Sequence, residues 1–283
     1  MACESSYYLR SHNYPRRMVL YWIIFRMHSM VATSGCRGVY RNPLPPVRFR
    51  DDIGHLLREL GLTGRGVELG VARGEFTTIT LEGWRMCSYF VQVDTWQHLV
   101  NYLDIANHAQ HVQDRFQSEA FKRLQDQISL GHARDGAQCI NTTTSCAERY
   151  PDSHFDFIYV DARHDRKGVL EDLSTWWPKL RQGGIMAGHD YTTQKEPKPS
   201  PWAASFYTRR FGTDPAGSGQ NWTLNGDGTV DESGRATKGA VDDFFNGAAE
   251  EYGIGGPPDL RECPRQLQVT YREIAWNSWI VRK

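Results

Sequence analysis

The sequence predicts an α/β fold built on a doubly wound, mostly parallel sheet that closes with an antiparallel pair of strands. Short apolar runs without polar alternation, such as residues 157–160, are typical of strands covered on both faces. Between such runs lie stretches with apolar residues at helical spacing, as in a sheet with crossover helices. Two last strand-like runs, at residues 267–271 and 276–281, close the chain and predict the antiparallel pair.

Composition limits the kinds of partner and compartment. The chain has 283 residues with 33 basic and 33 acidic side chains, so its net charge does not point to nucleic acid. The six cysteines show no CxxC spacing and no dense framework. This pattern predicts reduced thiols in an intracellular protein rather than disulfides or a zinc site.

Residues 1–47 are predicted to be an N-terminal extension, and residues 48–283 a single domain. Arg10, Arg16 and Arg17 precede an apolar stretch at residues 18–25, and Glu4 is the only acid before Asp51. The apolar stretch is below the roughly 18 residues that span a bilayer. Two interpretations stay open, an organelle-targeting segment or a poorly ordered extension. The expected location is accordingly organellar or cytoplasmic.

The first strand and helix of the domain enclose a glycine loop. Residues 67–69 are predicted as a strand, residues 70–74 as the loop and Glu75 as the start of a helix. Glycines such as Gly70 and Gly74 let backbone approach a ligand or adopt positive φ. A second strand ends at Asp94, about twenty residues later, where nucleotide-binding folds place the acid that holds a ribose. An ordinary turn between strand and helix is the alternative.

The middle of the chain is predicted to be a long helical region followed by a third strand. Residues 96–131 are expected to be mostly helical, with apolar side chains such as Phe121 and Leu124 turned inward. The third strand, residues 138–141, leads into a polar run that includes Thr144 and Ser145. This run either lines the adenine end of a cofactor site or is a plain loop.

Residues 156–191 form the unit expected to carry the chemistry. They are predicted as strand, loop, helix, Gly183-Gly184 turn and strand, with acids such as Asp165 and Asp172 at a solvated helix start. Ligands of open α/β sheets bind beyond the carboxyl ends of the strands. The unit therefore places four polar side chains on one rim: Asp161, His164, His189 and Asp190.

Residues 192–237 are predicted to be a lid or insertion over this rim. The segment is rich in Pro, Gly, Ser and Thr and holds a hairpin signal at residues 225–228. Its aromatic side chains would give the lid apolar contact area: Trp202, Phe206, Tyr207 and Trp222. A helix is expected to follow at residues 240–252.

Several pieces of the chain, in their order, resemble one enzyme family. They are VELGVARGEFT, VDTW, FDFIYVDARHD, LRQGGIMAGHDY, KGAVDDFF and SWIVRK, and they cover most of residues 64–283. The chain resembles the class I S-adenosylmethionine-dependent methyltransferases, and within them the small-molecule O-methyltransferases of the macrocin and mycinamicin sugar type. The resemblance implies a Rossmann-like, seven-stranded sheet.

The resemblance also implies roles for particular residues. Glu68, Gly70 and Gly74 would surround the methionine part of S-adenosylmethionine, and Asp94 would take the ribose hydroxyls. Asp161 and Asp190 correspond to acids that bind Mg²⁺ in many relatives, and His164 to the general base. His189 stands where those relatives have an acid, so a softer ion such as Mn²⁺, or no ion, is an open alternative.

The expected function is therefore methyl transfer to a hydroxyl oxygen of a small molecule, with an acceptor that the sequence does not specify. A nicotinamide-dependent oxidoreductase shares the glycine loop and the acid after strand two, but the loop lacks the full G-x-G-x-x-G pattern. A catalytically silent cofactor-binding protein is a third alternative. An exposed aromatic lid would be consistent with a homodimer.

Overall fold

The computed structural model describes residues 44–100, 102–104, 106–194, 222–246, 260, 263, 265–271, 273 and 276–283. Within them, seven strands form one sheet in the order β3-β2-β1-β4-β5-β7-β6. The strands are β1 Arg65–Leu69, β2 Tyr89–Asp94, β3 Gly136–Ile140, β4 Phe155–Val160, β5 Leu180–Gly188, β6 Gln268–Val269 and β7 Trp279–Arg282. β1 pairs in parallel with both β2 and β4, and β7 pairs antiparallel with β5 and β6. The predicted fold class is confirmed.

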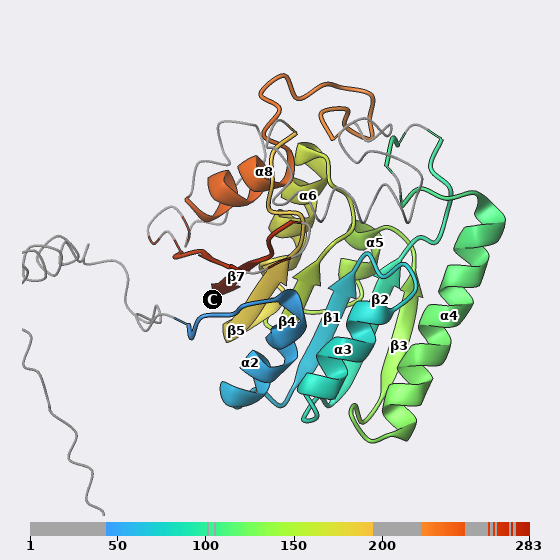
Figure 1. The fold of residues 1–283 in the computed structure, drawn as a ribbon, viewed down its shortest axis with the longest axis vertical. Helices are drawn as coiled ribbons and strands as arrows, with labels where there is room; N and C mark the ends of the chain where they lie inside the picture. The colour runs from blue at the N-terminus through green and yellow to red at the C-terminus, as the bar shows by residue number, and fades with distance from the viewer. Residues whose placement is uncertain are drawn as a thin grey trace, which may run out of the picture. The chain divides into compact units, whose positions relative to one another are not determined.

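Helices cover both faces of the sheet (Figure 1). The described helices are η1 Arg50–Asp52, α2 Ile53–Glu59, α3 Glu75–Gly83, α4 Gln110–Ser129, α5 Thr143–Ala147, α6 Arg166–Trp176 and α8 Ala236–Phe245. Apolar side chains of α2, α3 and α4 share one buried cluster with Phe157 and Tyr159 of β4. Those of α5, α6 and α8 share the other cluster with Ile158 and Val160. Successive β4 residues thus point to opposite helical layers, which explains the unbroken apolar run.

The chain starts at the centre of the sheet and works outward in two directions. β1 and β4 are neighbours, with β2 and β3 on one side and β5 on the other. In sheets of this kind, loops diverge at the point where the strand order reverses and leave a crevice at the carboxyl ends. The residues that follow β1, β2, β4 and β5 therefore lie at the edge of the sheet where this kind of fold binds its ligands.

The prediction of a mostly helical segment at residues 96–131 is wrong for its first part. Helix α4 begins only at Gln110. Trp96 has a left-handed φ of 44°, and Asn107 exchanges hydrogen bonds with the backbone of Leu99, so local polar contacts replace helical ones. Within α4, Leu124 is buried as expected, whereas Phe121 is 48% exposed.

Two expectations for residues 156–191 also need correction. Gly183 and Gly184 lie inside β5, where the pairing with β4 shifts register, rather than in a turn before it. Asp165 is fully buried and accepts the Gly168 N–H at 2.9 Å as the N-cap of α6. Asp172 is buried too and accepts a hydrogen bond from Thr143. These acids hold helices in place instead of facing solvent.

The segments that flank the central unit are described in part. Val47 is buried in the same cluster as Ile53, so the chain joins the core just before α2. The hairpin signal forms a turn in which the Asn225 N–H donates to Thr229 O at 2.9 Å. Helix α8 covers the first part of the predicted helix, and residues 247–252 lie outside the described residues, as do residues 1–43 and 195–221. No helix in the described part of the chain has the length and apolar character needed to cross a membrane.

Candidate functional site

Three of the four predicted rim residues come together at the ends of β4 and β5. One ligand atom from each of Asp161, His164 and Asp190 lies within 4.8 Å of the others. The His164 Nε2 atom is 2.9 Å from Asp190 Oδ2 and 3.5 Å from Asp161 Oδ1. These three residues are called the acid–histidine cluster below.

His189, the fourth rim residue, lies beside this cluster. Its Nδ1 atom is 3.3 Å from Asp190 Oδ1, so it contacts the second oxygen of the carboxylate that His164 contacts. Asp190 itself has a positive φ of 51°, a conformation that costs free energy in any residue with a side chain. Such strain concentrates at functional sites, where surrounding contacts maintain it.

His164 is held in place from the side opposite the cluster. Its Nδ1 atom lies 2.7 Å from Asp104 Oδ2, and its backbone N–H donates to Tyr102 Oη at 2.9 Å. Trp222 donates its indole N–H to the same Asp104 oxygen at 3.0 Å, and its ring centroid is 5.2 Å from that of His164. A described part of the predicted lid thus packs directly on the histidine.

Sequence reasoning missed Asp104. The residue lies in the stretch that was predicted to be helical, where an acid is expected on a solvated face. No motif marks it, because the pairing joins residues 60 positions apart. The sequence offered one signal: Asp104 follows the second strand and is the single acid between Asp94 and Asp114.

The charges of the site shift the pKa values of its members. Burial opposes protonation of His164, but Tyr102, Asp104 and Asp190 hold its pKa well above the ordinary value. Burial likewise opposes ionisation of Asp190, yet His189 and His164 keep its pKa well below the ordinary range. With no ion bound, Asp104 and Asp190 thus favour the imidazolium form of His164.

The carboxylates of the cluster fit a divalent ion. Asp161 and Asp190, with the His189 imidazole beside Asp190, offer the mixture of oxygen and nitrogen ligands that Mn²⁺ accepts. They suit Mg²⁺ less well, because that ion prefers oxygen ligands. Arg50 supplies a competing positive charge, with Nη1 3.6 Å from Asp161 Oδ2.

The glycine loop between β1 and α3 is fixed by its neighbours. Asp94 Oδ2 accepts the backbone N–H groups of Val71 and Ala72 at 2.8 and 3.0 Å. Gly70 has a φ of +79°, and a Cβ there would come within 2.0 Å of the Asp161 carbonyl oxygen. Gly74, at φ +77°, packs against Ala120 of α4. The loop is consequently in contact with the backbone of the acid–histidine cluster.

Glu68 lies buried beneath this loop in a chain of polar side chains. Its carboxyl group accepts a hydrogen bond from Thr77, to which Gln92 donates at 2.9 Å. Gln138 of β3 donates to Gln92 in turn at 3.0 Å. Burial raises the pKa of Glu68 to about 8, so the group is protonated at neutral pH in this environment.

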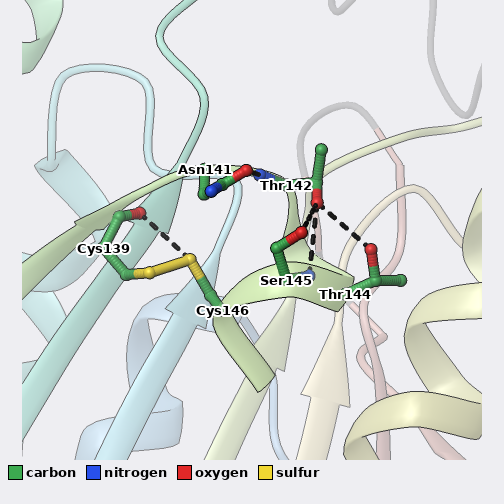
Figure 2. The surroundings of a disulfide bond; sticks show 6 residues. All are labelled: Cys139, Asn141, Thr142, Thr144, Ser145 and Cys146. Atoms are coloured by element: carbon green, nitrogen blue, oxygen red, sulfur yellow. Dashed lines mark hydrogen bonds between the residues drawn. A yellow bond between two sulfur atoms is a disulfide. The ribbon is translucent and has the colours of Figure 1, made fainter. Parts of the chain in front are cut away.

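Thr144 and Ser145 lie at the start of α5, beside a disulfide that the sequence did not predict (Figure 2). Their hydroxyl oxygens lie 3.1 and 3.0 Å from that of Thr142, the N-cap of α5. Cys139 and Cys146 are disulfide-bonded, with Cα atoms 6.1 Å apart. The reduced thiols expected from sequence are wrong for this pair, because the turn from β3 into α5 brings the two residues within bonding range. Cys263 is also disulfide-bonded, and Cys87 is a buried free thiol.

The hairpin at residues 225–228 packs on the beginning of α6. Asp227 forms an ion pair with Lys167, and the Lys167 N–H donates to Asn225 Oδ1 at 3.3 Å. Thr237, at the start of α8, donates to the His164 carbonyl oxygen at 3.2 Å. The described hairpin thus contacts α6, and Thr237 contacts the backbone of His164.

Residues 67–191 match the model of a family described as a methyltransferase domain. Over these residues the chain is similar to a methyltransferase domain. Its sheet order and the position of its glycine loop agree with this match. The matched residues include Glu68, Asp94 and the whole acid–histidine cluster. No curated protein matches the chain in sequence.

Solved structures that are similar to the chain include O-methyltransferases. One is an O-methyltransferase family protein from Burkholderia thailandensis, with 9% identity and a TM-score of 0.46 over 82% of this chain and 55% of its own length. Another is a Bacillus cereus O-methyltransferase in complex with SAH, with 13% identity and a TM-score of 0.41 over 94% and 90%. TomG from Streptomyces achromogenes, in complex with SAM, has 11% identity and a TM-score of 0.43 over 82% and 78%.

Proposed function

We propose that this protein transfers a methyl group from S-adenosylmethionine to a hydroxyl oxygen of a small molecule. The observation that carries the proposal is the acid–histidine cluster, which lies against the glycine loop at the point where Gly70 packs on the Asp161 backbone. A base and two carboxylates next to a cofactor loop are what an oxygen nucleophile needs for positioning and deprotonation.

The cofactor is proposed to bind along the carboxyl ends of β1, β2 and β3. Glu68, Gly70 and Gly74 would surround its methionine part, Asp94 its ribose, and Thr144 with Ser145 its adenine end. Asp94 already accepts hydrogen bonds from two loop N–H groups, and a carboxylate retains lone pairs for a ribose hydroxyl. When bound, S-adenosylmethionine supplies an electrophilic methyl group whose bond to sulfur breaks as the acceptor oxygen attacks.

His164 is proposed as the general base and Asp104 as the residue that orients it. The acceptor hydroxyl would give its proton to His164 Nε2, while Asp104 holds Nδ1. Asp161 and Asp190, with His189 beside them, would hold a divalent ion such as Mn²⁺ or Mg²⁺. That ion would lower the pKa of the acceptor hydroxyl and, through its charge, that of His164.

The acceptor class, the location and the oligomeric state are further parts of the proposal. The acceptor class closest to the sequence resemblance is a sugar hydroxyl of the macrocin or mycinamicin type, and nucleic acid is not an expected partner. The intracellular location expected from reduced cysteines is not supported by the disulfide-bonded Cys139, Cys146 and Cys263. The exposed aromatic lid that would favour a homodimer is not supported by Trp222, which is buried against His164 and Trp276.

The test is methyl transfer itself. Purified protein is incubated with S-adenosylmethionine, Mn²⁺ and a panel of sugar, phenol and polyketide hydroxyls, and products are identified by mass spectrometry. The proposal expects S-adenosylhomocysteine together with a product that has gained one CH₂. Asp161→Asn and Asp190→Asn should each remove any activation by added Mn²⁺. Activity that ignores both a chelator and these substitutions would contradict the role of the ion.

A further inference from the structure

Arg50 brings a permanent positive charge to the acid–histidine cluster from outside the matched methyltransferase domain. It is the first residue of η1, and its Nη1 atom lies 3.6 Å from Asp161 Oδ2. Neither the sequence patterns nor the family match includes this residue. Its position next to a candidate ion ligand therefore needs an explanation of its own.

The contacts of Arg50 show that its position is built rather than accidental. Its backbone N–H donates to Glu273 Oε1 at 2.5 Å, and its guanidinium lies over the Phe76 ring, 5.7 Å from the centroid. Phe76 stacks in turn on Tyr159 of β4, with ring centroids 3.8 Å apart. Three separate parts of the chain thus fix the residue beside the carboxyl end of β4.

The charge of Arg50 acts on the accessible side of the cluster. The Asp161 side chain is 20% exposed and that of Asp190 is 7% exposed, so Asp161 is the acid that an incoming group meets first. The 3.6 Å separation is too long for a hydrogen bond, so the facing Asp161 oxygen keeps its capacity for another partner. Burial disfavours the charge, but Tyr159, Asp161 and Asp190 raise the pKa of Arg50 above its ordinary value.

We propose that Arg50 determines which ligands the cluster accepts: it weakens the binding of a lone divalent ion and favours an ion accompanied by an anionic acceptor oxygen. A fixed positive charge near Asp161 repels a cation held there and attracts a deprotonated hydroxyl. The charge of Arg50 would select an acceptor whose hydroxyl is acidic enough to ionise in the site. An acceptor with two neighbouring hydroxyls, bound as an anion, belongs to the same class. The inference rests on the proposed function and names a residue that tunes it.

The experiment measures Mn²⁺ binding alone, by electron paramagnetic resonance of the free ion, with no acceptor present. Arg50→Gln should bind Mn²⁺ about tenfold or more tightly than the wild type, because a like charge has been removed. Arg50→Lys, which keeps the charge, should stay close to the wild type. Arg48→Gln is the matched control: its side chain is 55% exposed and pairs with Asp52 at 3.8 Å, so its affinity should not change.

The Mn²⁺ affinities of these variants separate the inference from the proposed function. Equal Mn²⁺ affinity in the wild type and in Arg50→Gln would overturn the inference and leave the proposed function intact. No Mn²⁺ binding by any variant, with S-adenosylhomocysteine still bound, would overturn both the inference and the role of the ion, but not the methyltransferase assignment. Adding Asp161→Asn to Arg50→Gln should remove the gain, and its persistence would place the ion elsewhere. If Arg50→Gln unfolds, Arg50→Met serves as the charge-free variant, because its apolar side chain can still pack over the Phe76 ring.

Discussion

The two halves of the sheet edge use their charged residues differently. At the ends of β1 and β2, the Asp94 carboxylate accepts hydrogen bonds from the backbone N–H groups of Val71, Ala72 and Trp96. At the ends of β4 and β5, the carboxylates of Asp161 and Asp190 face a histidine instead. The first arrangement holds the glycine loop in one shape. The second keeps like charges close together and responds to any added charge or proton.

The difference predicts that the first region governs cofactor affinity and the second governs the rate. A preorganised loop lowers the conformational cost of binding, whereas groups that exchange protons act in the transition state. Substitutions in the two regions should therefore separate affinity for S-adenosylhomocysteine from turnover.

His164→Ala should reduce turnover by roughly 10²–10⁴ if the histidine is the general base. Affinity for S-adenosylhomocysteine should not change, because the His164 imidazole contacts Asp104 and Asp190, which are not part of the glycine loop. Rates of methyl transfer and calorimetric affinities of the same preparation check both parts. Wild-type turnover in this variant would remove His164 from the mechanism.

Asp94→Asn should show the reverse pattern. The amide presents one acceptor oxygen in place of two charged ones, so the charge-assisted bonds to the loop are weakened by about 1–3 kcal/mol. Affinity for S-adenosylhomocysteine should fall by roughly ten- to a hundredfold, while turnover at saturating cofactor stays near the wild type. Asp114→Asn, at an exposed position near the start of α4, serves as the matched control. Unchanged affinity in Asp94→Asn would show that the loop is not the cofactor site.

Glu68→Gln tests the buried acid beneath the loop through the pH dependence of stability. The pKa of Glu68 is raised from 4.5 to about 8, so the folded state binds more protons than the unfolded state between these values. The contribution of Glu68 to the free energy of unfolding therefore declines as pH rises from about 4.5 to 8. Its slope is at most about 1.4 kcal/mol per pH unit. The free energy of unfolding of Glu68→Gln, measured by denaturant at several pH values, should decline less steeply. Parallel pH profiles in both proteins would contradict a protonated Glu68.

The sequence predicted the parts of the molecule that depend on local pattern. The glycine loop, the strand-two acid and the rim of Asp161, His164 and Asp190 follow from where apolar runs stop, because parallel strands share one carboxyl edge. The closing strand pair and the hairpin at residues 225–228 follow from turn chemistry and alternation.

What the sequence did not predict depends on contacts between distant residues. Asp104 becomes part of the site only because the loop after β2 folds back over His164, 60 positions further along the chain. Arg50 reaches Asp161 from before the first strand. The Cys139–Cys146 pair was missed for another reason, because its spacing matches no familiar motif although the turn brings its Cα atoms to 6.1 Å.

The most direct test of the two-region account is calorimetric titration of the wild type with S-adenosylhomocysteine, with and without Mn²⁺. We expect binding near micromolar that does not depend on the ion, because the glycine loop is held by Asp94 and not by the acid–histidine cluster. No binding under either condition would contradict the cofactor site and the proposed function with it. Binding that requires Mn²⁺ would contradict the separation of the two regions.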